Sequence, residues 1–126
     1  MALRASEAPE ERAHQPVHAT FGETQHIHDG MRLSLVETAR LRGGPAPVRM
    51  SRFELAPGAQ SPLDTHEERE MWMFAQGNGM LSYRGQPAVP VRAGDVVAFE
   101  ADSSHTLTNT GSETLVVFSI WWKDQL

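Results

Sequence analysis

Residues 58–77, GAQSPLDTHEEREMWMFAQG, place side chains that can bind a metal next to an apolar strand pattern and between two glycines. Asp64 and His66 are two residues apart, and residues at this spacing in a β-strand point to the same face. Glu70 begins the apolar run that follows, where a carboxylate is costly unless it is paired or bound to a metal. We therefore expect these three side chains to reach one ion, at bond lengths of about 2.0–2.2 Å.

A fourth candidate ligand, His105, opens the later segment HTLTN. In a strand it shares its inward face with Leu107 and Asn109. A single histidine in a β-rich domain is more often a surface residue or a hydrogen-bonded core residue than a ligand. Here the candidates occur together in a chain without cysteine, so we predict a metal site built from Asp64, His66, Glu70 and His105.

These residues follow a pattern that resembles the cupin superfamily. The first cupin motif is similar in spacing to Gly58, Asp64, His66, Glu70 and Gly77, with Asp64 in place of the motif's first histidine. The second motif is similar to Gly94, Glu100, Asp102, His105 and Asn109, with Glu100 and Asp102 in place of the usual proline and second glycine. The resemblance covers roughly residues 48–122. It implies a small double-stranded β-helix barrel, or jelly-roll, with a metal inside and often a homodimer.

The 126 residues are enough for one domain with a core of its own. We expect an N-terminal arm and irregular lead-in over residues 1–47, in which MRLSLVE (31–37) is a strand or a short helix. An all-β barrel should then span residues 48–126. Its predicted strands, separated by turn signals, are VRMSRFEL, EMWMF, GMLSY, DVVAF, HTLTN and TLVVFSIWW.

Composition excludes several partners. The net charge of −5 argues against binding to nucleic acid or to anionic membranes. No apolar run approaches the roughly 18 residues of a membrane span, and the first residues lack the apolar core of a secretory signal. We therefore expect a cytoplasmic protein. The richness in Ala, Arg, Gly and Pro suggests a bacterial source.

Aromatic residues near the motifs are candidates for a pocket around the ion. Most of them should pack in the core or in a dimer seam, and a minority should line the pocket. The pocket-lining candidates are Trp72, Phe74, Tyr83 and Phe99. Trp121 and Trp122 are adjacent in a strand, so only one of them can face inward.

A second His-x-His pair, His26 and His28, lacks the flanking glycines and the glutamate of the first. An exposed polar strand explains this pair as well as a metal role over the barrel mouth does.

The role of Asp64 leaves two mechanisms open. If only His66, Glu70 and His105 bind the metal, the two-histidine, one-carboxylate set suits Fe(II) and oxygen chemistry, with Asp64 as a general base. If Asp64 also binds, two carboxylates cancel the charge of the ion and leave two open positions. That set suits Mn(II), Fe(II) or Zn(II), with isomerase, lyase or cyclase chemistry on an oxygenated substrate.

Function is less determined than fold, because cupins include oxygenases, isomerases, lyases, sensors and storage proteins. We expect a metal-dependent enzyme acting on a small molecule, with Asp64 and Glu70 as catalytic residues and a slight preference for Fe(II)-type dioxygenase chemistry. A non-catalytic cupin that binds or senses a ligand is the alternative. A purely structural barrel is disfavoured, because all four polar groups are retained.

Overall fold

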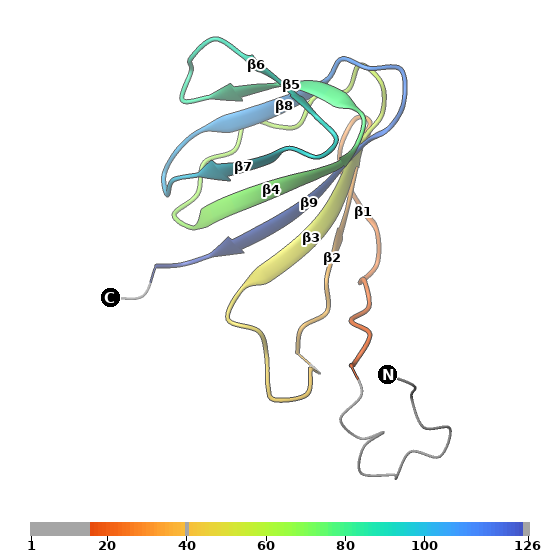
Figure 1. The fold of residues 1–126 in the computed structure, drawn as a ribbon, viewed down its shortest axis with the longest axis vertical. Helices are drawn as coiled ribbons and strands as arrows, with labels where there is room; N and C mark the ends of the chain where they lie inside the picture. The colour runs from red at the N-terminus through yellow and green to blue at the C-terminus, as the bar shows by residue number, and fades with distance from the viewer. Residues whose placement is uncertain (1–15, 40, 125–126) are drawn as a thin grey trace, which may run out of the picture.

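The structure is a computed structural model that describes residues 16–39 and 41–124, and within these ranges it contains nine β-strands and no helix (Figure 1). No helix long and apolar enough to cross a membrane occurs in the described part of the chain. The strands are β1 (Gln25–His28), β2 (Met31–Leu35), β3 (Arg49–Leu55), β4 (Arg69–Gln76), β5 (Asn78–Tyr83), β6 (Val89–Arg92), β7 (Val96–Phe99), β8 (His105–Asn109) and β9 (Leu115–Trp122).

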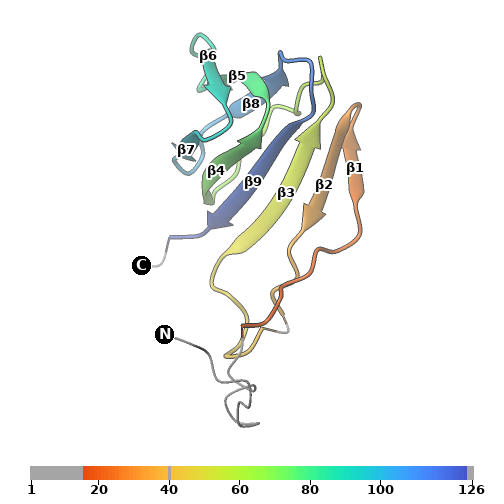
Figure 2. The ribbon, with the colours of Figure 1, turned by 45° about the vertical axis from the view of Figure 1, so that its right-hand side comes forward.

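The strands form two antiparallel sheets. The larger sheet has the order β1-β2-β3-β9-β4-β7, and the smaller has the order β6-β5-β8. Figure 2 shows β2, β3, β9 and β4 running side by side, with β5, β6 and β8 gathered at one end of them. This arrangement confirms the all-β jelly-roll expected from the sequence.

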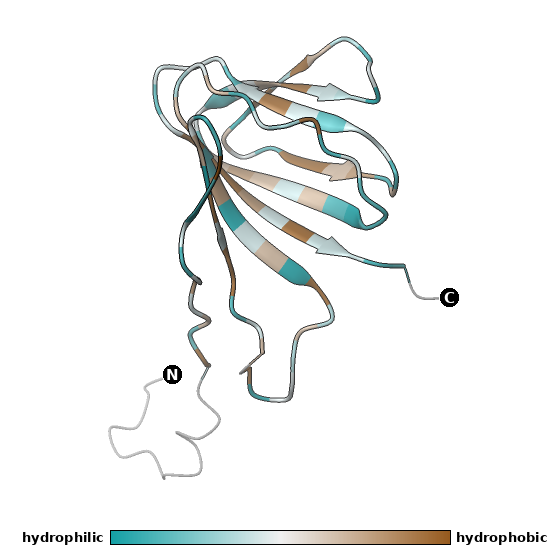
Figure 3. Cartoon of the chain, turned by 180° about the vertical axis from the view of Figure 1, so that it is seen from behind, coloured by the Kyte–Doolittle hydropathy of each residue, from teal (hydrophilic) through white to brown (hydrophobic). Residues whose placement is uncertain are grey.

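Alternation along β4 decides which side chains enter the space between the sheets. Glu70, Trp72 and Phe74 are buried, whereas Met71 and Met73 face outward. Figure 3 shows hydrophilic and hydrophobic positions interspersed along the strands of the large sheet. Residues two apart share a face of the sheet, so Glu70 lies on the core side, as its spacing predicts.

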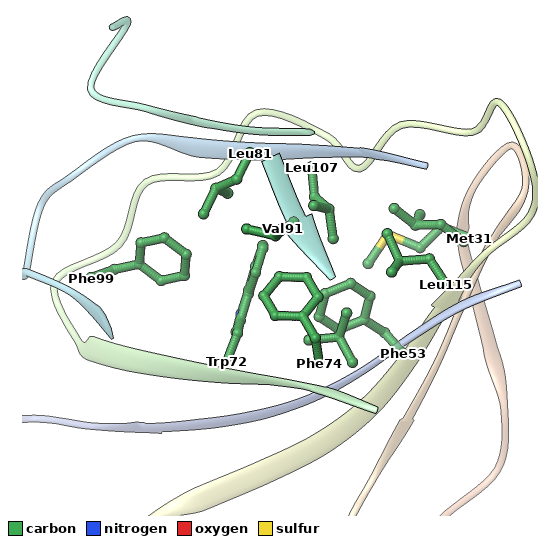
Figure 4. Packing of buried hydrophobic residues seen from close by; sticks show 11 residues of the cluster. Met31, Phe53, Trp72, Phe74, Leu81, Val91, Phe99, Leu107 and Leu115 are labelled. Atoms are coloured by element: carbon green, nitrogen blue, oxygen red, sulfur yellow. The ribbon is translucent and has the colours of Figure 1, made fainter. Parts of the chain in front are cut away.

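The core lies between the sheets, and its aromatic residues surround Trp72 (Figure 4). The Trp72 ring contacts Phe53 and Phe99 edge-on, with centroid distances of 5.1 and 4.8 Å. Leu55, Leu107, Leu115 and Val117 are fully buried around them. Truncation of any of these aromatic side chains to alanine should cost about 3–5 kcal/mol.

Gly77 closes the stretch 58–77 and makes the turn from β4 to β5. Its φ of +93° lies in the left-handed region, which glycine adopts without steric cost. A Cβ atom at this position would lie 3.0 Å from Leu115 Cα. Gly77 is thus the one residue between the two strands, and Asn78 and Gly79, expected with it in a turn, belong to β5.

The segment between β3 and β4 runs along β8 as an interrupted strand. Gly58 and Ser61 donate backbone hydrogen bonds to the carbonyls of Asn109 and Leu107, at 2.9 and 2.8 Å. Further along, Asp64 and His105 form an isolated antiparallel bridge. The segment is extended but not a regular strand, and its pairing with β8 places Asp64 opposite His105.

The expected strands at β3, β4, β5, β7, β8 and β9 are present, and residues 31–35 form β2 rather than a helix. The expected irregular lead-in needs a correction, because residues 25–28 and 31–35 are strands of the large sheet. β2 pairs with β3 along its whole length and buries Met31, and this packing fixes its conformation. The expected arm at residues 1–15 lies outside the described residues.

Candidate metal centre

Two backbone carbonyls orient the histidine rings. His66 Nδ1 lies 3.0 Å from the Glu68 carbonyl oxygen, and His105 Nδ1 lies 3.1 Å from the Ser103 carbonyl oxygen. A carbonyl can only accept, so each Nδ1 carries a proton; Nε2 then keeps a lone pair in the neutral ring and donates to Glu70 in the charged ring. His105 is 2% exposed, and its ring stacks on Phe99 with a centroid distance of 4.4 Å.

Glu70 lies between the two Nε2 atoms. Its Oε1 is 2.9 Å from His66 Nε2 and 3.3 Å from His105 Nε2. Its other oxygen, Oε2, accepts from Trp72 Nε1 at 2.8 Å and from the Ser119 hydroxyl. The carboxylate is therefore held from behind by β4 and β9, and Oε1 is directed toward the histidines.

The protonation of these groups follows from their surroundings. Burial raises the pKa of Glu70, but hydrogen bonds from His105, Ser119, Trp72 and His66 outweigh it and lower the pKa to about 2. Burial lowers the pKa of His66, but its hydrogen bond to Glu70 and the nearby carboxylates leave that pKa raised above its ordinary value. Glu70 is thus ionised, and its charge draws positive charge toward the imidazoles.

Glu70, His66 and His105 form a cluster in which hydrogen-bond acceptors can face one another. When both rings are neutral and carry their proton on Nδ1, the Nε2 lone pairs of His66 and His105 point at Glu70 Oε1, which is itself an acceptor. Added protons or a bound cation would satisfy these three atoms. The donor set of two imidazoles and a carboxylate therefore fits a divalent metal.

Asp64 adds a second carboxylate at the open side of the cluster. Its Oδ2 lies 3.9 Å from His66 Nε2 and 4.0 Å from His105 Nε2, and its side chain is 61% exposed. One atom from each of Asp64, His66 and His105 lies within 4.8 Å of the others. Two donors bound at about 2.1 Å stand about 3.0 Å apart at a right angle and at most about 4.2 Å apart. The separations of Asp64 and of Glu70 from the histidines fall close to this range, so either carboxylate fits one ion together with the two histidines.

The four predicted ligands meet at one end of a cavity of about 430 Å³. Ser51, Ser61, Ser119 and Glu68 also line this polar end. Apolar side chains form the remaining walls, and they are Ile27, Met31, Leu33, Leu35, Phe53, Pro62, Trp72 and Trp121.

Of the four aromatic residues that were candidates for the pocket lining, Trp72 lines the cavity. Phe74 is buried in the core, and Phe99 lies behind His105, against its ring. Tyr83 accepts a hydrogen bond from the Glu100 amide at 3.2 Å through its hydroxyl. Strand alternation predicts on which face of the sheet a side chain lies, but not how far along the barrel it lies. For this reason the sequence did not distinguish Phe74, Tyr83 and Phe99 from residues that line the cavity.

Several cavity residues were not expected from the sequence. β1 and β2 contribute Ile27, Leu33 and Leu35, and the large sheet contributes Ser119 and Trp121. The alternation of MRLSL gives a signal for the β2 residues, but nothing in it indicates that β2 pairs with β3. The expectation that only one of the two terminal tryptophans faces inward fits the structure, because Trp121 lines the cavity and Trp122 contacts Arg69.

The second histidine pair does not join the cluster. His26 and His28 lie on β1 with exposed side chains. Neither belongs to the group of Asp64, His66 and His105, whose ligand atoms lie within 4.8 Å of one another. The structure therefore agrees with the interpretation of this histidine pair as part of an exposed polar strand.

Comparisons with known proteins agree with the fold. Residues 51–121 match the family described as the cupin domain. An oxalate-binding protein from Thermotoga maritima is 30% identical over 121 residues, which cover 95% of this chain and 92% of that protein. A cupin 2 conserved barrel domain protein from Salinispora arenicola is similar in structure, with a TM-score of 0.67 and 23% identity, covering 98% of this chain and 91% of that one. A predicted oxalate decarboxylase from Thermotoga maritima is similar with a TM-score of 0.62 and 24% identity, covering 84% of this chain and 94% of that one.

Proposed function

This chain belongs to the cupin family, and from that premise we propose that it is a metal-dependent enzyme that acts on a small oxygenated organic molecule. The observation that carries the proposal is the convergence of two Nε2 atoms and Glu70 Oε1 at the end of a cavity. A cavity with mostly apolar walls and a few convergent polar groups is the usual form of a small-molecule site.

Fe(II)-type dioxygenase chemistry is our preferred reaction class. His66, His105 and Glu70 supply the two-histidine, one-carboxylate set that suits non-haem Fe(II), and Mn(II) or Zn(II) are the other candidates. When bound, such an ion polarises a substrate oxygen or activates dioxygen.

The protein's own groups have separate roles in this proposal. Glu70 holds the ion and balances part of its charge, while Trp72 and Ser119 keep its carboxylate in place. Asp64, with a largely exposed carboxylate beside both histidines, either binds the ion or takes a proton from the substrate. As a ligand it would favour isomerase, lyase or cyclase chemistry over oxygenation, because it cancels the remaining charge of the ion.

Metal identity and oxygen uptake test this proposal together. The chain would be purified without a chelating column, its metals measured by mass spectrometry, and oxygen consumption followed on a panel of small oxygenated metabolites. Iron with oxygen uptake supports the dioxygenase. Zinc or manganese with product formation and no uptake supports the isomerase or lyase branch. A protein that takes up none of these ions would contradict the metal-dependent function.

A ligand-binding protein without turnover is the second candidate. It is favoured by the 30% identity to a protein named for binding oxalate rather than for a reaction. Tight binding of a molecule that is recovered unchanged after long incubation with the metal-loaded chain would favour this candidate over the enzyme.

The expected homodimer has a candidate surface on the outer face of the large sheet. Met71, Met73 and Val96 are 37%, 57% and 54% exposed. Met73 pairs with both Val96 and Phe118, so these apolar side chains are neighbours across three strands. A contiguous exposed apolar patch is typical of an association surface.

A further inference from the structure

The cavity has two chemically different ends. One end carries the candidate ligands Asp64, His66, Glu70 and His105. The other is formed by apolar side chains of β1, β2 and β3, chiefly Ile27, Met31, Leu33, Leu35 and Phe53, while Trp121 lies on β9 opposite Glu70. A ligand that fills the cavity must therefore combine a metal-binding head with an apolar body.

Charge at the polar end disfavours a dianion. Asp64, Glu68 and Glu70 line the cavity, and none of the described residues that line it is a lysine or an arginine. Asp64 and Glu70 already bring two negative charges to the histidines that would hold a divalent ion, so a dianion would add two more charges that no lining cation offsets. Arg49 lies beside the wall, but its guanidinium is 5.6 Å from the Trp121 ring centroid and the residue does not line the cavity.

The size of the cavity gives an independent argument. At about 30 Å³ for each water, 430 Å³ corresponds to roughly 14 water molecules. A small dianion such as oxalate would leave most of the apolar wall in contact with water. A larger apolar body releases that water, which is favourable by about 25 cal/mol for each Å² of apolar surface removed from water.

We propose that this cavity selects a neutral or singly charged molecule with two adjacent oxygen donors at one end and an aromatic or branched apolar body at the other. It discriminates against oxalate, the ligand in the name of the 30% identical relative. The inference deepens the proposed function and rests on it, because the oxygen donors require the metal.

Calorimetry with matched probes tests the proposal. The Co(II)-loaded chain would be titrated with benzohydroxamate and acetohydroxamate, which share a singly charged two-oxygen head, and with oxalate. We expect benzohydroxamate to bind at least tenfold more tightly than acetohydroxamate, and oxalate to bind more weakly than either. Equal affinity for the two hydroxamates, or tighter binding of oxalate, would overturn the proposed ligand class.

A charge introduced into the apolar wall gives a second readout. Ile27 is 42% exposed at the edge of the sheet, so I27R should fold. We expect this variant to bind benzohydroxamate at least fivefold more weakly and oxalate more tightly, with Co(II) affinity unchanged. V89R, at an exposed position on the edge strand of the smaller sheet, is the matched control and should leave all three affinities unchanged. An I27R protein with wild-type preferences would contradict the assignment of this wall.

The same measurements separate the two proposals. If the wild-type chain bound no Co(II), the metal-dependent function would fail, and the ligand class would fail with it. If Co(II) bound but oxalate were preferred, only the ligand class would fail.

Discussion

The indole Nε1–H of Trp72 donates to Glu70 Oε2 at 2.8 Å, so a residue at the centre of the core positions the carboxylate of the metal site. Trp72 is 4% exposed and packs against Phe53 and Phe99. The packing of the barrel and the geometry of the site therefore depend on one side chain.

Replacement of Trp72 by phenylalanine should weaken metal binding about 10-fold to 100-fold, because it removes a hydrogen bond that orients Glu70. Competition with a chelating dye measures this affinity. Phe74→Leu is the control, since it loosens the same core without a contact to Glu70. Equal losses of affinity in W72F and F74L would show that packing, and not the hydrogen bond, is responsible.

Asp64→Ala should sharply lower the metal content of the purified protein if Asp64 is a ligand, because it removes a carboxylate within about 4 Å of both histidines. Metal content after dialysis measures the effect, and Asp29→Ala, in the exposed turn between β1 and β2, is the control. A fully metallated D64A protein would reduce Asp64 to a base or a bystander.

In the metal-free protein, the contribution of Glu70 and His66 to the free energy of unfolding should be largest between about pH 4.5 and 6.5. The lowered pKa of Glu70 gives stability that is complete above its ordinary value of 4.5 and is lost as pH falls toward about 2. The raised pKa of His66 gives stability that is complete below 6.5 and is lost as pH rises through the raised value.

Urea unfolding with a chelator present at pH 3, 5.5 and 8 checks this expectation. The Glu70 contribution corresponds to at most about 3 kcal/mol of unfolding free energy. Glu70→Gln should therefore flatten the pH profile, while Glu23→Gln, at an exposed position, should retain it. An unchanged dependence of the unfolding free energy on pH in E70Q would argue against an ion pair between Glu70 and His66 in solution.

Met73→Lys should convert a dimer to a monomer, because it puts a charge into the apolar patch on the outer face of the large sheet. Light scattering after size exclusion measures the mass of the particle. Val89→Lys is the control, since Val89 is 50% exposed on the edge strand of the smaller sheet. A monomeric wild-type chain, or a dimeric M73K protein, would place the association surface elsewhere or remove it.

Strands with alternating polarity between clear turns were predictable, and β4 is an example, because its burial follows the parity of Glu70, Trp72 and Phe74. β6 was not expected, and β1 was left open between an exposed polar strand and a metal role; both are edge strands. QHIH is exposed throughout, and VPVR contains Pro90, which an edge strand tolerates. Their conformation depends on a neighbouring strand, and local sequence does not contain that information.

The candidate site was predictable in its chemistry and less so in its surroundings. Asp64 and His66 were expected on one strand, but Asp64 meets His105 through backbone hydrogen bonds of 3.1 and 3.0 Å, and the Asp102 amide donates to the His66 carbonyl. The Ser119 contact to Glu70 joins β9 to β4, whereas Trp72 and Glu70 are two residues apart on β4 itself. Contacts between strands follow from sheet order, which residue spacing alone does not fix.

The cavity wall has a consequence for how specificity can change during evolution. Among the candidate ligands, Glu70 and His105 are buried in the core, so exchange of either of them disturbs the barrel. Half of the apolar wall instead comes from the short hairpin of β1 and β2, within residues 25–35 at the edge of the large sheet. We expect divergent copies of this chain to change ligand preference first in that hairpin, while the metal chemistry is inherited unchanged.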